Sequence, residues 1–149
     1  ISDIDGMVIG GHSDVGMVPL TSNATRNSIN VSEFVTKERL EKVKQDTKVG
    51  GATLTKLLGT SAWYAPGAAV SALVQAIACD QHKMFPCSAL LEGEYGLTDS
   101  TIGVPVILGK NGIEKIVEID LTEDEKALLS ESAAGVSATH GLLTDLNLF

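Results

Sequence analysis

One stretch, MVIGGHSDVGMVPL, organises the rest of the chain and runs from Met7 to Leu20. Its first three residues are uncharged and partly β-branched, which predicts the end of a buried strand. Gly10 and Gly11 end that strand, because residues without a Cβ permit backbone conformations and close approaches that others cannot adopt. We therefore expect His12 where a strand opens into a loop, a frequent place for chemistry on a rigid scaffold.

His12 is the candidate catalytic residue of this stretch. An imidazole titrates near neutral pH, so it can both accept and donate a proton there. The alternative is a histidine that only completes the hydrogen bonding of a turn, since one short motif is weak evidence by itself.

The composition is that of an ordinary globular domain. A chain of 149 residues with 44% hydrophobic and 20% charged residues is enough for one domain. The net charge of −8 argues against binding to nucleic acid or to an anionic membrane surface. An anionic substrate stays possible, because a site can be locally positive within an acidic protein.

The cysteines and histidines indicate the compartment and exclude a zinc signature. Cys79 and Cys87 are expected to be buried as small apolar residues. A chain with two cysteines and no other stabilising cross-links favours a reducing compartment, the cytoplasm. The three histidines are scattered, and no Cys/His cluster has the spacing of a zinc site. The chain starts at Ile1 without a methionine, which we interpret as a piece of a longer protein.

The first half of the chain predicts two helices. Thr36 is a plausible N-cap for a mostly solvated helix that the pair Gly50-Gly51 bends or interrupts and Gly59 ends. A second helix, rich in small residues, follows Pro66. The polar residues 24–29 are a further, weaker helix candidate.

The second half predicts strands and one more helix. Residues 84–91 form a strand, and residues 102–108 and 113–119 form a hairpin whose Asn111-Gly112 pair supplies positive φ angles. Pro105 cannot donate to a neighbouring strand, which places its strand at an edge or a bulge. Thr122 and Glu125 have the spacing of a capping box for a helix that runs to about His140. Together these elements predict a single α+β domain with antiparallel strands.

The run SAWYAP, from Ser61 to Pro66, is the second unusual stretch. Pro66 fits an early helix position, where a missing N–H costs nothing. Small and hydroxyl residues before a helix N-terminus also suit an anionic ligand. The sequence leaves both interpretations open.

Several of these motifs resemble the lactate/malate dehydrogenase family. Residues 11–14 with 17–19 resemble the family's catalytic histidine motif. Residues 93–96, 102–109 and 112–114 are similar to segments of its C-terminal domain, in the same order. The resemblance covers nearly the whole chain and identifies residues 1–149 as a C-terminal substrate/catalytic domain. The run from Ser61 to Pro66 resembles bacterial malate dehydrogenases of the lactate-dehydrogenase-like type.

The resemblance implies an NAD-dependent interconversion of malate and oxaloacetate, a reaction of the tricarboxylic acid cycle. It implies that His12 exchanges the hydroxyl proton of malate, that Ser61 and Ala62 border the substrate, and that Pro66 lies on the nicotinamide side of the cofactor NAD. It also implies a homo-oligomer, a dimer or a tetramer.

The sequence departs from the family pattern in two ways. Ser13 stands where the family commonly has glycine, and Val15-Gly16 lengthens the loop by one residue. No Gly-x-Gly-x-x-Gly follows a strand, so the Rossmann half that would hold most of the NAD is expected to be absent. The family also has a Leu-Asp-x-x-Arg segment, which supplies an acidic partner for the histidine and an arginine for the substrate. This segment is not among these residues either. Arg26 is expected to be a surface residue.

These departures predict that this chain alone is inactive, while its full-length parent is an enzyme. Two alternatives stay open. One is a non-catalytic oligomerisation or binding module, in which the small-residue helix of residues 67–77 and the apolar C-terminal tail of residues 142–149 make contacts between subunits. The other is a lactate dehydrogenase.

Overall fold

The computed structural model describes residues 3–13 and 15–145 and shows one α+β domain. Every strand pair among these residues is antiparallel, as the sequence predicts. A five-stranded sheet has the order β3-β2-β7-β6, with β8 also paired to β7, and a three-stranded sheet has the order β1-β4-β5. The elements are β1 (Ile4–Asp5), β2 (Val8–Gly10), β3 (Met17–Pro19), β4 (Thr25–Arg26), β5 (Ile29–Asn30), α1 (Lys37–Leu58), α2 (Tyr64–Ala78), β6 (Lys83–Glu92), β7 (Thr98–Gly109), β8 (Gly112–Ile116) and α3 (Glu123–Asp145).

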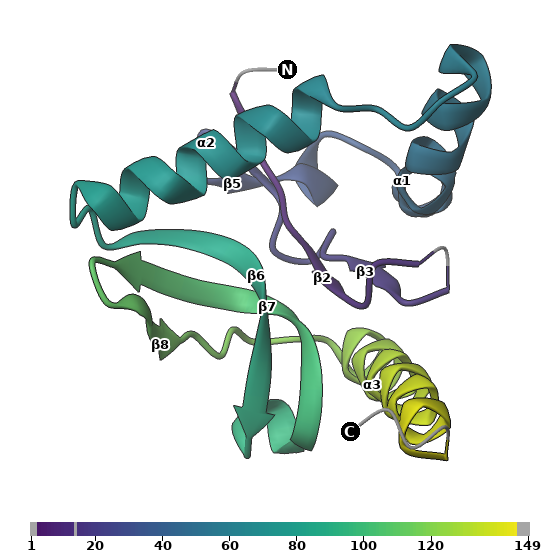
Figure 1. The fold of residues 1–149 in the computed structure, drawn as a ribbon. Coiled ribbons are helices and arrows are strands. Elements are labelled where there is room, and N and C mark those ends of the chain that lie inside the picture. The colour runs from purple at the N-terminus through teal and green to yellow at the C-terminus, as the bar shows by residue number, and fades with distance from the viewer. Residues whose placement is uncertain (1–2, 14, 146–149) are drawn as a thin grey trace.

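The core lies where α2 and α3 cover the larger sheet. Figure 1 shows α2 lying along β6 and β7, while α3 packs near β2, β3 and β7. Every second residue of β7 from Ser100 to Leu108 is buried, which is the period of a strand, and Pro105 and Gly109 are buried as well. The apolar side chains that form this core are Ile9, Val18, Leu20, Ala76, Ala89, Leu91, Ile102, Val104, Val106, Leu108, Leu121, Leu129 and Ala133.

Two glycines join the β2–β3 hairpin to the centre of the sheet. β2 pairs with β7 where Gly10 faces Gly103. A Cβ on Gly103 would lie 2.6 Å from the carbonyl oxygen of Gly10, closer than real Cβ atoms come to backbone. The absence of side chains therefore lets the two strands meet and fixes the loop that follows Gly10 to the sheet.

The hairpin of β7 and β8 differs from expectation in two respects. β7 is a central strand rather than an edge strand, with β6 on one side and β2 and β8 on the other. Pro105 lies opposite Pro86 and between the points where β2 and β8 pair with β7, so its missing N–H interrupts little of the ladder. Of the pair Asn111-Gly112, only Gly112 has a positive φ, at +93°.

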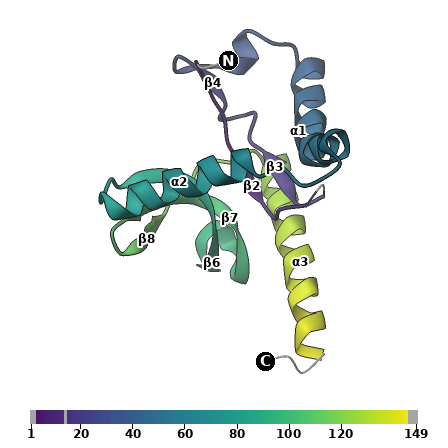
Figure 2. The ribbon, with the colours of Figure 1, turned by 45° about the horizontal axis from the view of Figure 1, so that its top comes forward.

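The helix α1 is one hydrogen-bonded element that contains the glycine pair Gly50-Gly51. Figure 2 shows that its two ends run in different directions, so the helix bends without being interrupted. Glycine pairs are a common cause of such bends. Thr36 caps its start by accepting a hydrogen bond from the Arg39 N–H at 3.4 Å, and Gly59 ends it with a φ of +69°. Both caps confirm the sequence prediction.

Other expectations are corrected. Residues 24–29 are not helical but contribute to the short strands β4 and β5. Arg26 is a surface residue, as predicted, and its Nε lies 2.7 Å from the Asp3 carboxylate. Cys79 is exposed rather than buried, whereas Cys87 is half-buried. The helix α3 continues past His140 to Asp145.

Two further points complete the fold. Ile1, Asp14 and the end of the apolar C-terminal tail lie outside the described residues. Among the helices that the structure describes, none has the length and apolar character needed to cross a lipid bilayer.

Candidate active site

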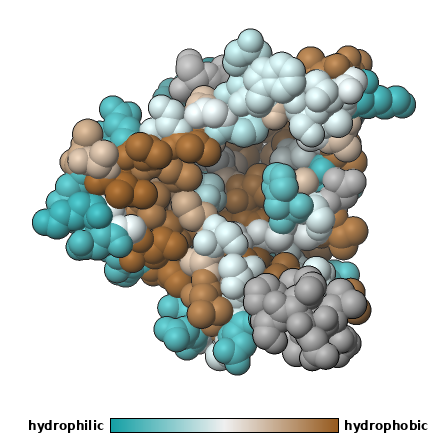
Figure 3. All heavy atoms as spheres, in the orientation of Figure 1, coloured by the Kyte–Doolittle hydropathy of each residue, from teal (hydrophilic) through white to brown (hydrophobic). Residues whose placement is uncertain are grey.

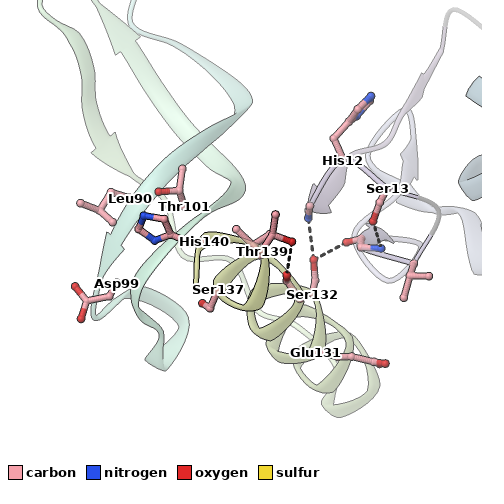
Figure 4. A pocket seen from close by; sticks show the side chains of 15 residues that line it. His12, Ser13, Leu90, Asp99, Thr101, Glu131, Ser132, Ser137, Thr139 and His140 are labelled. Atoms are coloured by element: carbon pink, nitrogen blue, oxygen red, sulfur yellow. Dashed lines mark hydrogen bonds between the residues drawn. The ribbon is translucent and has the colours of Figure 1, made fainter. Parts of the chain in front are cut away.

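His12 lies in the loop between β2 and β3, as the sequence predicts. Gly10 ends β2 with a φ of +93°, a conformation that residues with a side chain rarely adopt. The imidazole is exposed, and Figure 4 shows it pointing away from α3. An acid/base group at this place is open to a molecule that binds against the loop.

Ser13 organises the loop that carries His12. Its Oγ accepts a hydrogen bond from the Gly16 N–H at 2.9 Å, and its carbonyl oxygen accepts one from the Met17 N–H at 3.0 Å. These two hydrogen bonds hold the loop in a compact turn. The chain therefore enters β3 although the loop is one residue longer than the family pattern. The hydroxyl of Ser13 thus has a structural use that glycine would not supply.

Ser132 of α3 anchors the same loop from outside, and sequence reasoning missed this residue. The Gly11 N–H donates to the Ser132 Oγ at 2.8 Å, and the Ser132 hydroxyl donates to the Gly16 carbonyl oxygen at 2.7 Å. Ser132 is only 6% exposed. The sequence signal that could have identified Ser132 is its position as a polar residue on the apolar stripe of a helix, beside Leu129 and Ala133.

Two cavities border the loop. The larger, of about 840 Å³, lies between residues 11–13, 15 and 16 of the loop, the strands β6 and β7, and the stretch 131–140 of α3. His140, interpreted from sequence as a simple helix-end residue, lines this cavity and lies near Thr101 and Asp99 in Figure 4. The smaller cavity, of about 480 Å³, lies between β2, β6 and β7. His12 lines both, so it sits at a concave part of the surface.

Cys87 lines the smaller cavity but is a poor nucleophile there. Burial raises the pKa of its thiol above the ordinary value. Because the thiolate is the reactive form, the sulfur stays protonated and unreactive at neutral pH. His12 remains the group in this part of the molecule best suited to proton transfer.

The structure does not bring Ser61, Ala62 and Pro66 into these cavities. All three lie at the junction of α1 and α2, where Ser61 and Pro66 are exposed and Ala62 is half-buried. Pro66 occupies the first turn of α2, the early helix position that the sequence allowed. Trp63 is the N-cap and makes no capping hydrogen bond through its side chain. The roles expected for these residues stay predictions.

The charged groups that usually assist such a histidine are not seen beside it. Within the part of the chain that the structure describes, no ion pair joins His12 to a carboxylate. Arg26 belongs to the smaller sheet and is held by Asp3.

Comparison with known proteins places these features in a family. Residues 2–140 match the family described as lactate/malate dehydrogenase, alpha/beta C-terminal domain. Malate dehydrogenase from Bacteroides thetaiotaomicron is 59% identical over 145 residues, which cover 97% of this chain and 46% of that protein. Malate dehydrogenase from Flavobacterium johnsoniae is 56% identical, with 97% of this chain and 47% of that protein covered.

Solved structures show the same relationship. The 1.55 Å structure of malate dehydrogenase from Salinibacter ruber superposes with a TM-score of 0.93 at 43% identity, covering 98% of this chain and 48% of that one. Lactate dehydrogenase from Eimeria maxima, solved with NADH and oxamate, gives 0.92 at 36% identity, covering 99% and 47%. The chain spans about half the length of the relatives that it matches.

Proposed function

The chain belongs to the lactate/malate dehydrogenase family, as its α/β C-terminal domain, and from this premise we propose that it is the catalytic C-terminal part of an NAD-dependent malate dehydrogenase. The observation that carries the proposal is the placement of His12, exposed at a concave surface on a loop anchored to both the sheet and α3. Relatives with 56–59% identity are malate dehydrogenases.

In this proposal His12 moves the proton of the reaction. When malate is oxidised, a ring nitrogen of His12 accepts the proton of the C2 hydroxyl, and the C–H bond at C2 breaks as the carbonyl of oxaloacetate forms. When NAD is bound, it supplies the acceptor for the hydride that leaves C2. In the reverse direction His12 returns the proton to the new alkoxide oxygen. General acid–base transfer of this kind contributes about 10²–10⁴-fold to the rate.

Three further residues have proposed contacts. Ser61 and Ala62 border the substrate, and Pro66 borders the nicotinamide ring. Their support is their location before and within the first turn of α2, where helix amides favour an anionic group such as a substrate carboxylate. They lie outside the two cavities lined by His12, so the proposal requires a bound substrate to span both segments.

The described residues fit only the reacting end of NAD. Dinucleotides bind at the carboxyl ends of parallel strands, whereas every described strand pair here is antiparallel. We propose that an N-terminal part of the full-length protein binds most of the cofactor and supplies the acid that orients His12. Residues 1–149 alone are then expected to be inactive.

The assembly and compartment are also proposals. Figure 3 shows hydrophobic side chains gathered over α2 and the neighbouring strands. Val70 and Val74 of α2 and Met84 and Leu90 of β6 are each about half exposed. Exposed apolar patches commonly mark contact surfaces, which supports a homo-oligomer, a dimer or a tetramer. The free cysteines Cys79 and Cys87 support the cytoplasm as the compartment. Sedimentation of the full-length protein measures this assembly directly.

A lactate dehydrogenase is the second candidate. The observation in its favour is the TM-score of 0.92 with the Eimeria maxima enzyme. The higher identity to malate dehydrogenases, up to 59% against 36%, favours the first proposal.

The replacement His12→Asn in the full-length protein tests the proposed chemistry. We expect kcat for NADH oxidation with oxaloacetate to fall about 10²–10⁴-fold, because asparagine can hydrogen-bond to the substrate but cannot transfer its proton. His82→Asn, an exposed histidine in the turn between α2 and β6, is the matched control and should stay close to wild type. A His12→Asn enzyme within twofold of wild type would contradict the proposal.

A further inference from the structure

We infer that Ser132 is a positioning residue for His12, holding the active-site loop at both ends through one hydroxyl group. The inference rests on the proposed function, since it gives the loop a catalytic purpose. Figure 4 shows Ser132 on α3 facing the loop, with dashed lines to the backbone on either side of it. At the described loop residues 11–13, 15 and 16, no hydrogen bond comes from another side chain of a distant element.

The two hydrogen bonds bracket His12. The donor at 2.8 Å is the N–H of Gly11, the residue directly before His12. The acceptor at 2.7 Å is the carbonyl oxygen of Gly16, where the loop returns toward β3. Because the same oxygen accepts one bond and donates the other, it links the start and the end of the loop. The loop therefore cannot shift as a unit without breaking a buried hydrogen bond.

The packing around Ser132 is close and specific. A Cβ added to Gly10 would lie 3.2 Å from the Ser132 Oγ, and one added to Gly11 would lie 3.3 Å from it. The glycine pair thus lets the backbone approach the hydroxyl, in addition to ending β2. Ser132 itself is fixed by α3, whose neighbouring residues Leu129 and Ala133 are buried in the core.

The anchoring acts on His12 through its backbone. The imidazole is exposed and has no described ion-pair partner, so its direction depends on where the loop holds its Cα. Proton transfer needs the donor and acceptor atoms in narrow alignment, and a displacement of about 1 Å can cost about 10²-fold in rate. Removal of the Ser132 hydroxyl should therefore lower kcat without removing any group that contacts the substrate.

The test uses Ser132→Ala in the full-length protein. We expect kcat with oxaloacetate to fall about 10- to 100-fold, while KM for NADH stays within about twofold because the loop displacement leaves cofactor binding unchanged. Hydrogen–deuterium exchange measured by mass spectrometry should become faster in the peptide of residues 7–20. Ser130→Ala is the matched control, because Ser130 is an exposed serine of the same helix, and it should resemble wild type in both measurements.

A second control separates positioning from general destabilisation. Leu129→Val shortens a buried side chain of α3 without touching the hydroxyl. A Ser132→Ala enzyme with kcat within twofold of wild type would overturn the inference. It is also overturned if Leu129→Val lowers kcat as much and exchange in residues 7–20 stays unchanged in Ser132→Ala.

The two proposals fail in distinguishable ways. If the wild-type protein does not reduce oxaloacetate, the proposed function fails. The exchange measurement still decides the anchoring: faster exchange of residues 7–20 in Ser132→Ala supports it, and unchanged exchange refutes it.

Discussion

At the scale of single residues, the site depends on glycines that allow backbone segments to meet. Gly103 of β7 faces Gly10 of β2, and Gly10 leads directly into the loop of His12. A side chain at Gly103 would push β2 away from β7, whereas a side chain at Gly10 would meet the Gly16 carbonyl oxygen and the Ser132 hydroxyl. The position of the loop that carries His12 is thus set by residues without side chains.

We predict that Gly103→Ala destabilises the protein by about 1–3 kcal/mol, the usual cost of forcing an extra group into a packed interior. The reason is that its Cβ would lie 2.6 Å from the Gly10 carbonyl oxygen, which is backbone and cannot move aside cheaply. Urea unfolding followed by circular dichroism measures the change. Gly6→Ala is the control, since a Cβ there meets nothing within 4 Å, and it should stay within about 0.5 kcal/mol of wild type. Equal stability of the two variants would refute this account of the β2–β7 contact.

Sequence patterns located His12 but not the residues that hold it. The apolar run and the glycine pair are local signals, and they predicted the end of β2 correctly. Ser132 is 121 residues from Gly11, and a hydrogen bond over that separation depends on how α3 packs. His140 joined the wall of the larger cavity for the same reason.

At the scale of elements, the start of α3 is tied to the segment after β3 by one buried carboxylate. Glu125 accepts hydrogen bonds from the Thr122 N–H at 3.0 Å and from the Ser22 hydroxyl at 2.6 Å. The Glu125 N–H donates to the Thr122 Oγ1 at 3.3 Å, which completes the predicted capping box. The bond to Ser22 was not predictable, because it joins residues 103 positions apart.

The same carboxylate makes stability depend on pH. Burial raises the pKa of Glu125, but the hydrogen bonds from Ser22 and Thr122 outweigh burial and hold that pKa below its ordinary value. A lowered pKa in the folded state contributes stability above the ordinary carboxyl pKa of about 4.3, and this contribution is lost as the pH falls through the lowered value.

We therefore predict that Glu125→Gln lowers the free energy of unfolding by about 1–3 kcal/mol at pH 7, because a charge-assisted buried hydrogen-bond network is weakened. The difference from wild type should narrow as the pH falls below the ordinary carboxyl pKa of about 4.3 and through the lowered pKa of the folded state, where the wild-type carboxylate also becomes neutral. Glu123→Gln, an exposed neighbour, is the control. A difference that stays constant between pH 7 and pH 3 would show that the Glu125 charge is not responsible.

Regular elements were predicted well where the signal was local and less well where tertiary contacts decided. The caps of α1 and α3 and the strand β6 follow from nearby residues. Pro105 was expected at an edge or a bulge, yet β7 is a central strand. It accommodates Pro105 because this residue falls between the pairing points of β2 and β8, and a register shift follows at Ile107/Leu108. Residues 24–29 contribute to short strands because β1 pairs with β4. Helix propensity takes no account of such a tertiary partner.

At the scale of the whole molecule, the domain presents a histidine without the groups that would complete an active site. The described residues provide His12 on an anchored loop and two bordering cavities. They show no carboxylate paired with His12 and no parallel sheet for a dinucleotide. These facts agree with a chain that spans about half the length of its relatives, and they explain why the sequence could indicate the family but not complete the site.

The most direct test of the central claim is the ratio of kcat/KM for oxaloacetate to kcat/KM for pyruvate, measured by NADH oxidation with the full-length protein. If it is a malate dehydrogenase, oxaloacetate should be preferred by at least about 10²-fold, since a site built to pair a second carboxylate discriminates strongly against a substrate that lacks it. Equal or faster turnover of pyruvate would contradict the assignment and favour a lactate dehydrogenase. Absence of turnover with both 2-keto acids would favour a non-catalytic module of the same fold.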